Sequence, residues 1–378
     1  MFELIHANKR RSTVLVGTML LLLLLFGFAI GGALFPGASG MTRQDGTQAF
    51  AFDPAGGFVG MGIAFFIWMF QAALAYFQGG NILLAVSGAK RIEKNDHPQL
   101  YNVVEEMSIA ARLSKPPAVY VMDDMALNAF ATGRSPEDAA VAVTAGLLGR
   151  MNRDQLQGVV AHEIGHIVNR DILFMTMVSI MLGTIVMLSE LFLRSLWYSA
   201  GSSRRYRSDS NKSGGAQAVL MVVAIVLAIL APLLAQVIYF ACSRRREYLA
   251  DARAAVFTRY PEGLASALEE ISNDAGVPAR VNKATAPMYI SNPLQKDGAA
   301  LHLFATHPPI AQRIAILRGM AGGISYANYQ TAWARAAGKD AANMPRSALG
   351  AGEQPAREAD PNAGTTTGKR RRMRDAGD

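Results

Sequence analysis

The sequence predicts a mainly α-helical integral membrane protein, in which four hydrophobic helices accompany an α+β domain with a small sheet. Apolar residues make up 51% of the 378 residues and charged residues only 17%, a low charge content for a soluble protein. The apolar residues gather in four almost uncharged runs, at 13–35, 57–77, 172–193 and 216–241. Each run is about long enough to cross a hydrocarbon core of ~30 Å as a helix.

The first two runs predict an N-terminal transmembrane hairpin at residues 1–92. Basic residues at 9–11 precede the first run and would also suit a signal peptide. The apolar stretch exceeds the ~7–15 residues of a signal core and no clear cleavage pattern follows, so we expect an uncleaved anchor. Lys90 and Arg91 follow the second run. The positive-inside rule therefore places the N-terminus and everything after Lys90 in the cytoplasm.

The last two runs predict a second hydrophobic hairpin at residues 172–241. If both runs cross the membrane, the loop between them lies outside. That loop has one acidic residue, Asp209, and five basic ones, Arg194, Arg204, Arg205, Arg207 and Lys212. The positive-inside rule disfavours this charge outside. Either the first hairpin dominates the topology, or the second pair enters the membrane and returns without crossing; both alternatives return Arg244 to the cytoplasm.

The composition also narrows the function classes. Cys242 is the only cysteine, so no intramolecular disulfide and no cysteine-based metal site can form. The net charge of +8 gathers beside the apolar runs and in the tail, which fits contact with a lipid bilayer better than with nucleic acid. From residue 337 the chain is rich in Gly, Ala, Pro, Thr and charge, which predicts a disordered basic tail at 337–378.

Residues 93–171 predict the first part of the α+β domain. A helix begins at Pro98 with apolar residues on one face, and the prolines at 116–117 follow it. Short β-rich stretches predict strands at 118–122, 128–132 and 141–144. The next helix begins with Asn152 or Asp154 as its cap, and we expect it to continue through Asp171 into the third apolar run.

Residues 242–336 predict the second part of the same domain. The stretch 243–268 has helix-favouring residues with mixed charges and predicts one long helix. The stretch 273–298 is irregular and rich in Pro and Asn. A short helix is expected at 308–318.

The most informative motif is His162-Glu163-Ile164-Gly165-His166, on the helix that leads into the third run. Two histidines four residues apart lie on one helix face and can bind one metal ion. Glu163 is rotated by about a quarter turn and can reach a water beside that ion. This HExxH pattern arises by accident in about one chain of this kind in a hundred. An exposed helix with two incidental histidines is disfavoured, because the neighbouring residues are apolar almost all round.

A catalytic zinc site needs a third protein ligand. The best candidate is Glu247, because the chain leaves for the membrane near Ile172 and returns near Ser243, so the two flanks are neighbours. Asp251 lies one turn beyond Glu247 and can accept a hydrogen bond from the outer nitrogen of a liganding histidine. The alternative for both residues is a solvated, charged helix face.

This motif order resembles the HtpX family of membrane zinc proteases, which is related to the CAAX prenyl-protein endopeptidases. Further matches are the stretch 128–133 and Thr306-His307-Pro308-Pro309 with Arg313. The resemblance covers about residues 1–320. The chain departs from the family in a longer loop at 199–215 and in its extended basic tail, which leaves regulation and partners open.

The resemblance implies a zincin-like catalytic domain in the cytoplasm and a multi-pass protein of the inner membrane of a bacterium. It implies one Zn²⁺ per subunit, held by His162, His166 and Glu247, with Glu163 as the catalytic base. The expected reaction is cleavage of polypeptides, above all membrane or misfolded proteins, in membrane protein quality control or stress response.

Three further roles are expected with their alternatives. His307 is a second donor to the oxyanion or a residue of a surface turn. Arg313 holds the local structure or pairs with an acidic residue. The stretch Asn128, Ala129 and Phe130 is an edge strand to which substrate adds as a β-strand, or an ordinary core strand.

The main alternative function is a non-catalytic membrane scaffold or chaperone that keeps zinc for structure. Glu163 beside an open three-ligand site favours the enzyme, because structural zinc is normally closed by four protein ligands. A transporter is a weaker alternative, because four spans are few and the charged motifs lie outside them.

Overall fold

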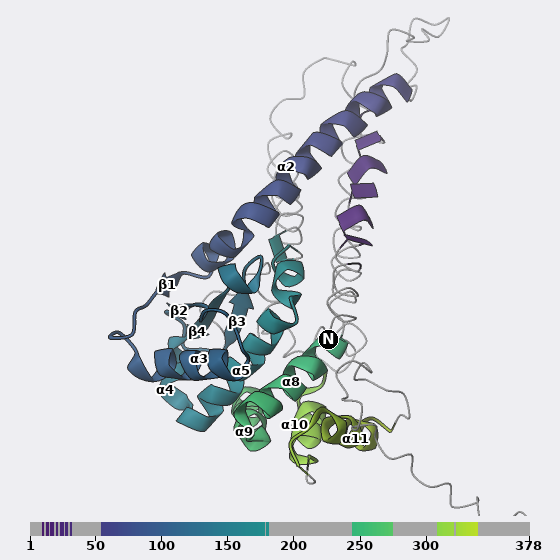
Figure 1. Ribbon diagram of the computed structural model, residues 1–378. Coiled ribbons are helices and arrows are strands. Elements are labelled where there is room, and N and C mark those ends of the chain that lie inside the picture. Colours follow the sequence, from purple (N-terminus) through teal and green to yellow (C-terminus); the bar gives the residue numbers. More distant parts are fainter. Residues whose placement is uncertain are drawn as a thin grey trace, which may run out of the picture.

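The computed structural model describes residues 54–177, 179–180, 244–274, 308–320 and 323–338, with separate residues of an N-terminal helical segment between 10 and 31. In this part of the chain, one long apolar helix leads down to a small sheet, and the remaining helices gather below it (Figure 1). The expected mixture of helices and a small sheet is confirmed.

The sheet has four strands in the order β1-β2-β4-β3: β1 (Ala89–Arg91), β2 (Ala118–Met122), β4 (Ala140–Thr144) and β3 (Ala129–Thr132). Strands β2 and β4 are parallel, whereas β1 and β3 pair antiparallel at the two edges. Strands β2, β3 and β4 match the predicted ranges within about one residue, whereas β1 was not expected. A short 3-10 helix, η1 (Pro136–Asp138), connects β3 to β4.

Alternating residues send the strand side chains to two different cores. Val119, Val141 and Val143 pack in the larger core, with helices α3 (Pro98–Ala110) and α5 (Arg153–Val168). Phe130 and Ala142 point to the other face, where α2 (Pro54–Val86) covers the sheet. This period-2 alternation places β3 directly against α5 on one side and α2 on the other.

Helix α2 is the candidate membrane span within the described residues. It contains no charged residue, and its most apolar window has a mean hydropathy of 1.9. The predicted span 57–77 lies inside it. Gly27 and Gly31 of the N-terminal segment leave no room for a Cβ against Gly60 of α2, so these backbones touch. The run 13–35 is described at separate residues only, and 172–193 and 216–241 lie mostly or wholly outside the described residues.

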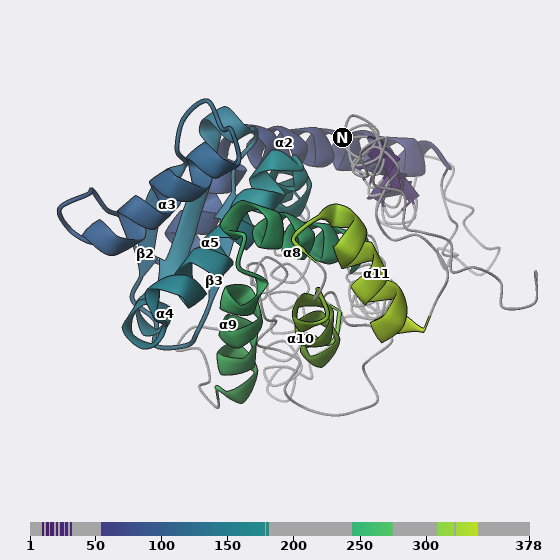
Figure 2. The ribbon, with the colours of Figure 1, turned by 60° about the horizontal axis from the view of Figure 1, so that its bottom comes forward.

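The remaining helices enclose α5. Helix α4 (Ala145–Arg150) precedes it, and Figure 2 shows α8, α9, α10 and α11 on its other side. Their bounds are Arg244–Thr258 for α8, Pro261–Asn273 for α9, Ile310–Arg318 for α10 and Tyr326–Ala337 for α11. Helix α5 therefore has helices or sheet on all sides, as its apolar composition predicts.

Two predicted helices are shorter than expected. The helix α5 ends at Val168, because Arg170 adopts a left-handed backbone with φ of 57° and a separate helical segment begins at Asp171. The single helix expected at 243–268 is two helices. Arg259 is left-handed with φ of 52°, and Pro261 starts α9 at a position where its missing N–H is tolerated.

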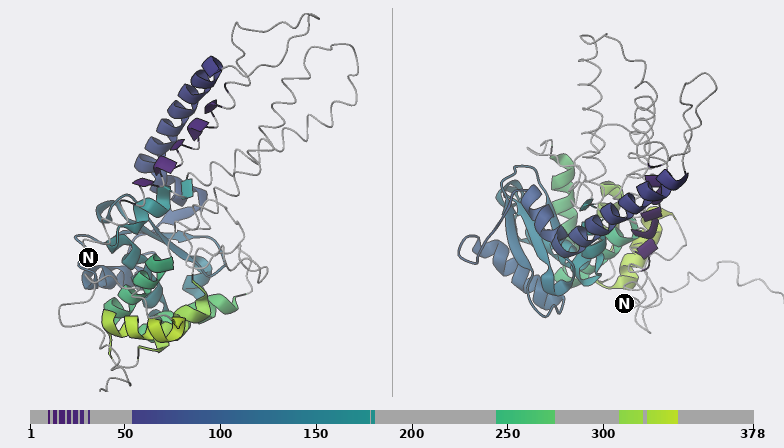
Figure 3. Two further views of the ribbon diagram at one scale, coloured as in Figure 1. Left: turned by 90° about the vertical axis from the view of Figure 1, so that its right-hand side faces the viewer. Right: turned by 90° about the horizontal axis from the view of Figure 1, so that it is seen from above.

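Helix α11 was not expected. Ser325 caps its start by accepting a hydrogen bond from the backbone N–H of Asn328, 3.1 Å away, and the left-handed Gly338 ends it. Tyr329 and Trp333 face the core from this helix. The residues after Gly338, which include almost all of the predicted basic tail, lie outside the described part. Figure 3 shows the helical base and the long α2 from two further directions.

Candidate active site

Helix α5 carries the HExxH motif inside the protein. Asn152 is its cap: the Asn152 side chain accepts from the Gln155 backbone N–H at 2.9 Å, and the Gln155 side chain accepts from the Asn152 N–H at 3.0 Å. This reciprocal pair is a capping box, and it fixes where the helix begins. The motif follows two to three turns later, where His162, Glu163 and His166 are 1%, 2% and 3% exposed.

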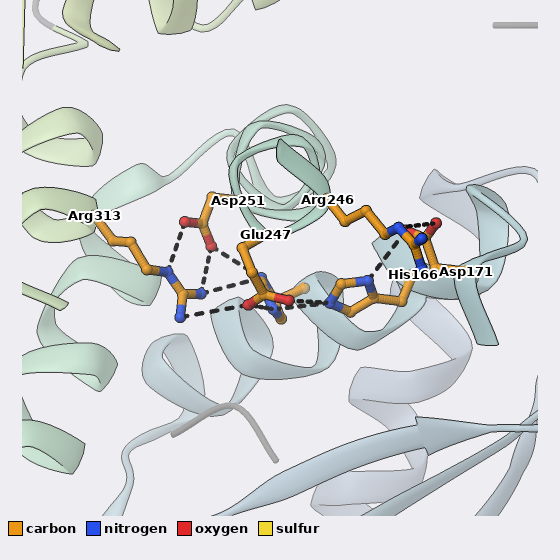
Figure 4. A network of polar contacts seen from close by, with 7 residues as sticks. His166, Asp171, Arg246, Glu247, Asp251 and Arg313 are labelled. Carbon is orange, nitrogen blue, oxygen red and sulfur yellow. Dashed lines mark hydrogen bonds and ion pairs between the residues drawn. The ribbon is translucent and has the colours of Figure 1, made fainter. Parts of the chain in front are cut away.

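The two histidines face one another and also face α8. Their Nε2 atoms are 3.3 Å apart. Glu247, in the first turn of α8, lies with one carboxylate oxygen 3.7 Å from His162 Nε2 and the other 3.5 Å from His166 Nε2. The ligand atoms of these three residues all lie within 4.8 Å of one another. The structure therefore brings together the three residues predicted to bind the metal (Figure 4).

A glycine allows α8 to come this close. A Cβ on Gly165 would lie 3.2 Å from the Cα and 3.3 Å from the carbonyl oxygen of Ala250 on α8. These distances are shorter than ordinary van der Waals contacts. Only a glycine, which has a hydrogen in place of the Cβ, therefore fits here without moving α8. Gly165 is the variable fourth residue of the HExxH motif, and here its size sets the gap between the two halves of the site.

The outer nitrogen of each histidine is held by its own carboxylate. His162 Nδ1 lies 2.9 Å from Asp251 Oδ1, and His166 Nδ1 lies 3.3 Å from Asp171 Oδ2. An N–H at Nδ1 donates to the carboxylate in each case, which leaves the lone pair at Nε2 for a metal. This arrangement orients a metal-binding imidazole and makes it more basic.

Asp251 is itself held by Arg313 of α10. The guanidinium donates from Nε at 2.8 Å and from Nη2 at 2.7 Å to the two oxygens of Asp251. Its Nη1 lies 3.8 Å from the Glu247 carboxylate. Arg313 is fully buried, so this bidentate pair fixes the position of Asp251 behind His162. Two roles were expected for Arg313, and the structure shows the pairing with an acidic residue, Asp251.

Sequence reasoning missed the role of Asp171. It is 0% exposed, and besides His166 it approaches Arg246, whose Nε lies 3.9 Å away. The Arg246 guanidinium also lies 3.7 Å above the centre of the Phe174 ring. The sequence does show an acidic residue five positions after the second histidine. However, only the left-handed backbone at Arg170 brings the Asp171 carboxylate back to the His166 ring.

Glu163 points to the sheet side of the site. Its carboxylate accepts a hydrogen bond from the backbone of Ala131 in β3, and burial raises its pKa to about 7, with the negative charge of Glu247 adding to the effect. A carboxyl group with this pKa can both accept and return a proton near neutral pH. Burial and the charge of Glu247 thus make this carboxyl group easier to protonate than an exposed glutamate.

The protonation of the two histidines differs. Burial opposes charge on His166, but its hydrogen bond to Asp171 and the carboxylate of Glu247 outweigh burial and raise its pKa to about 9. Burial lowers the pKa of His162, with the nearby Arg313 and His166 adding to this and Asp251 opposing it. The buried carboxylates thus favour a positive charge at the point where the ligand atoms meet. A metal ion would satisfy the same demand.

The remaining predicted residues have different outcomes. Asn128 precedes β3, and Ala129 and Phe130 belong to it; all three are at most 5% exposed. The Phe130 side chain packs in the core under α2, so it is not a contact for a ligand in the metal centre. His307 lies outside the described residues.

Comparison with known proteins agrees with this geometry. The model of peptidase family M48 matches residues 94–321, which include both halves of the site. A Protease HtpX homolog of Dictyoglomus thermophilum is 43% identical over 319 residues, 84% of this chain and 94% of the relative. A Protease HtpX homolog of Streptococcus gordonii is 38% identical over 320 residues, 85% of this chain and all of the relative.

Among solved structures, the crystal structure of S. mikatae Ste24p is similar with a TM-score of 0.42 and 20% identity, covering 84% of this chain and 67% of that one. The matches to the two HtpX relatives are much stronger, and each covers more than four fifths of this chain. On these matches, the chain belongs to peptidase family M48 as a metalloprotease of the HtpX type.

Proposed function

We propose that this metalloprotease is a zinc endopeptidase of the bacterial inner membrane, which cleaves cytoplasmic regions of membrane or misfolded proteins in quality control or stress response. One observation carries the proposal: the ligand atoms of His162, His166 and Glu247 converge beside Glu163, deep inside the protein. The sequence separation between the two helices means that only a folded domain can assemble this group.

Zinc fits the donor set best. Two imidazole nitrogens and one carboxylate oxygen, with a position left open, are typical ligands of catalytic zinc, whereas magnesium and calcium prefer oxygen ligands alone. When bound, zinc polarises the scissile carbonyl and makes a water molecule a stronger nucleophile at neutral pH. Asp251 and Asp171 keep both imidazoles in the tautomer that leaves Nε2 for the ion.

Glu163 acts as the general base. It takes a proton from the attacking water and passes it to the leaving amine. The hydrogen bond from Ala131 holds its carboxylate at the junction of α5 and β3, beside the metal-binding atoms. His307, which the sequence pattern suggests as an oxyanion donor, completes the proposed catalytic residues.

Strand β3 is proposed to bind the substrate through its backbone. It is the last strand of the sheet formed by the described residues. The Asn128 carbonyl accepts from the Thr144 N–H at 3.0 Å, so the backbone groups of alternate residues, Phe130 and Thr132, also turn to β4. Those of Ala129 and Ala131 then point away from the sheet. The N–H groups of Ala129 and Ala131 already donate, to the Asn128 side chain at 3.1 Å and to Glu163, so an extended polypeptide would pair through the carbonyls of these two residues and pass Glu163.

The proposed membrane arrangement has four spans, with the N-terminus and the catalytic domain in the cytoplasm. Helix α2 supports it by its length, its lack of charge and its exposed phenylalanines. Lys90 and Arg91, directly after α2, support the cytoplasmic side. The two alternatives for residues 172–241, full crossing or entry and return, both keep α5 and α8 on the same side.

The test is a pair of substitutions in the full-length protein in detergent, with cleavage of a denatured protein and bound zinc both measured. Glu163→Gln should lower cleavage by at least about a thousandfold and keep one zinc per chain, since the base is lost but no ligand is. Glu247→Gln should lose cleavage and most of the zinc. Glu106→Gln, an exposed glutamate on α3, is the matched control and should change neither.

The outcome also separates the enzyme from the scaffold. A non-catalytic scaffold would keep its function in cells with Glu163→Gln, and cleavage that survives this substitution would show that Glu163 is not the base. With cleavage abolished and zinc kept, the same variant becomes a trap: incubated with native membranes, it should retain its polypeptide substrates for identification.

A further inference from the structure

A cavity lies where α2 meets the sheet, away from the metal ligands. Its volume is about 550 Å³. The end of α2, strand β1, the loop before β2, the loop after β3 and the helical segment after α5 each contribute to its wall. Figure 1 shows the lower end of α2 beside β1, at the base of the long apolar helix. The cavity therefore sits where the apolar surface of α2 gives way to the polar catalytic domain.

Three cationic side chains line this cavity: Arg91, Lys115 and Arg134. Arg134 pairs with Asp138 at 2.8 Å and lies 5.6 Å above the Tyr76 ring. Arg91 and Lys115 are both exposed and have no ion-pair partner within the part of the chain that the structure describes.

The acidic residues of the cavity offset its positive charge only in part. Asp138 is engaged by Arg134, and the Glu137 carboxylate is hydrogen-bonded to Ser135. Glu137 stays ionised, so three cations face two carboxylates and the lining keeps one net positive charge, at Arg91 of strand β1 and Lys115 of the loop before β2. A ligand with a negative group would satisfy both.

An apolar stripe leads to the mouth of the cavity. Phe66, Phe70 and Phe77 recur at spacings of four and seven residues, which places them on one face of α2. They are 64%, 70% and 65% exposed, and Phe77 itself lines the cavity. Such exposure of large apolar side chains in a row marks a surface for lipid or another apolar partner. Tyr76, beside Phe77, is an aromatic residue of the kind that lies at membrane–water interfaces.

We propose that this cavity binds the headgroup of an anionic phospholipid, such as phosphatidylglycerol, with the acyl chains along the phenylalanine stripe. Arg91 and Lys115 contact the phosphodiester, because charge-assisted hydrogen bonds to phosphate are strong and an arginine can make two in parallel. The hydroxyl of Tyr101, which also lines the cavity, supplies a neutral donor. An anionic lipid satisfies the cationic cavity and the adjoining apolar stripe together.

The site touches the end of strand β3 but none of the metal ligands. Gly133 and Thr176 line the cavity, and the Thr176 hydroxyl binds the Thr132 hydroxyl at 2.9 Å. Lipid binding can therefore be measured directly, whether or not the protein is cleaving substrate.

The test titrates the full-length protein in detergent with phosphatidylglycerol and counts bound lipids by native mass spectrometry. The double variant Arg91→Gln with Lys115→Gln should bind on the order of tenfold more weakly or worse, because two of the cations at the headgroup are lost. The matched control is Lys90→Gln with Arg112→Gln, which removes two exposed cations that do not line the cavity. It should bind within about twofold of the unaltered protein. Equal affinities of the two double variants would overturn the proposal.

Further arms identify the source of the phosphate group. Phe77→Ser should weaken phosphatidylglycerol binding, and inorganic phosphate or glycerol phosphate at the same concentration should not displace the lipid. Displacement by the soluble phosphates would show a soluble anion site instead. A denatured polypeptide is also tested as a competitor. If it displaces the lipid, and the double variant Arg91→Gln with Lys115→Gln weakens only the binding of the polypeptide, the cavity binds substrate and the lipid proposal is overturned. Lys115→Glu, a single exposed change, repeats the test should the double variant be unstable.

Discussion

Helices α5 and α2 are both apolar along most of their length, yet they meet opposite surroundings. In α5, eleven of the sixteen residues are buried by the sheet and by other helices. In α2, the phenylalanines at 58, 66, 70 and 77 are each about two thirds exposed. An apolar helix sequence thus predicts that water is excluded, but not whether protein or lipid excludes it.

The polar residues reveal which of the two applies. Helix α2 has no charged side chain over 33 residues, so it has no ionised group that needs a partner. Helix α5 carries His162, Glu163 and His166 in its buried part, and buried polar groups need partners. Helix α8 supplies Glu247 and Asp251 from about 80 residues later in the chain, and Asp171 and the Ala131 backbone supply the remaining partners. The need for partners is what identifies α5 as the helix of a site.

The largest expected effect compares two phenylalanines, one from each environment. Phe130 is 0% exposed in the core between the sheet and α2, whereas Phe70 is 70% exposed on α2. Phe130→Ala should lower the free energy of unfolding by about 3–5 kcal/mol, because it removes a buried ring and leaves a cavity. Phe70→Ala should leave it within about 0.5 kcal/mol in detergent. Thermal unfolding of the purified proteins measures both, and equal losses would mean that α2 is packed by protein along its length.

The next effect compares a glycine from each helix. A Cβ at Gly165 would lie 3.2 Å from the Cα of Ala250, whereas a Cβ at Gly62 of α2 would have no atom within 4 Å. Gly165→Val should push α8 from α5, destabilise the protein by about 1–3 kcal/mol and weaken zinc binding, because Glu247 moves with α8. Gly62→Val should leave zinc binding unchanged. A Gly165→Val protein with normal zinc affinity would show that the two helices can adjust without moving the ligands.

The local elements of the catalytic domain could be predicted because each has a short-range signal. The strands at 118–122 and 140–144 are bounded runs of Ala and β-branched residues, and α5 has an Asn–Gln capping pair. Glu247 could also be placed near the histidines, because both ends of a membrane hairpin return to the same surface. These inferences need only periodicity, caps and the direction of the chain.

The missed features depend on backbone conformations that sequence does not announce. Arg170 and Arg259 are left-handed although neither is a glycine, and each ends a helix that was expected to continue. Pro261 was an available signal for the second break. Ser325 was an available signal for α11, although that helix is otherwise held by tertiary contacts of Tyr329 and Trp333. The left-handed backbone at Arg170 is what brings Asp171 to His166. The role of Asp171 could therefore not be predicted from the sequence.

The smallest expected effect concerns Asp171. This residue lies between the metal centre of α5 and α8 and the part of the protein that packs under α2. It holds His166 at 3.3 Å, while Thr176, further along the same helical segment, contacts Thr132 below α2. Asp171→Asn should weaken zinc binding by about 10–100-fold with little change in unfolding temperature, because the imidazole keeps its packing but loses its charged partner. Thr176→Val, the matched control, should leave zinc affinity unchanged. Competition with a coloured chelator measures both, and equal affinities would mean that Asp171 only packs and that the metal centre ends at α5 and α8.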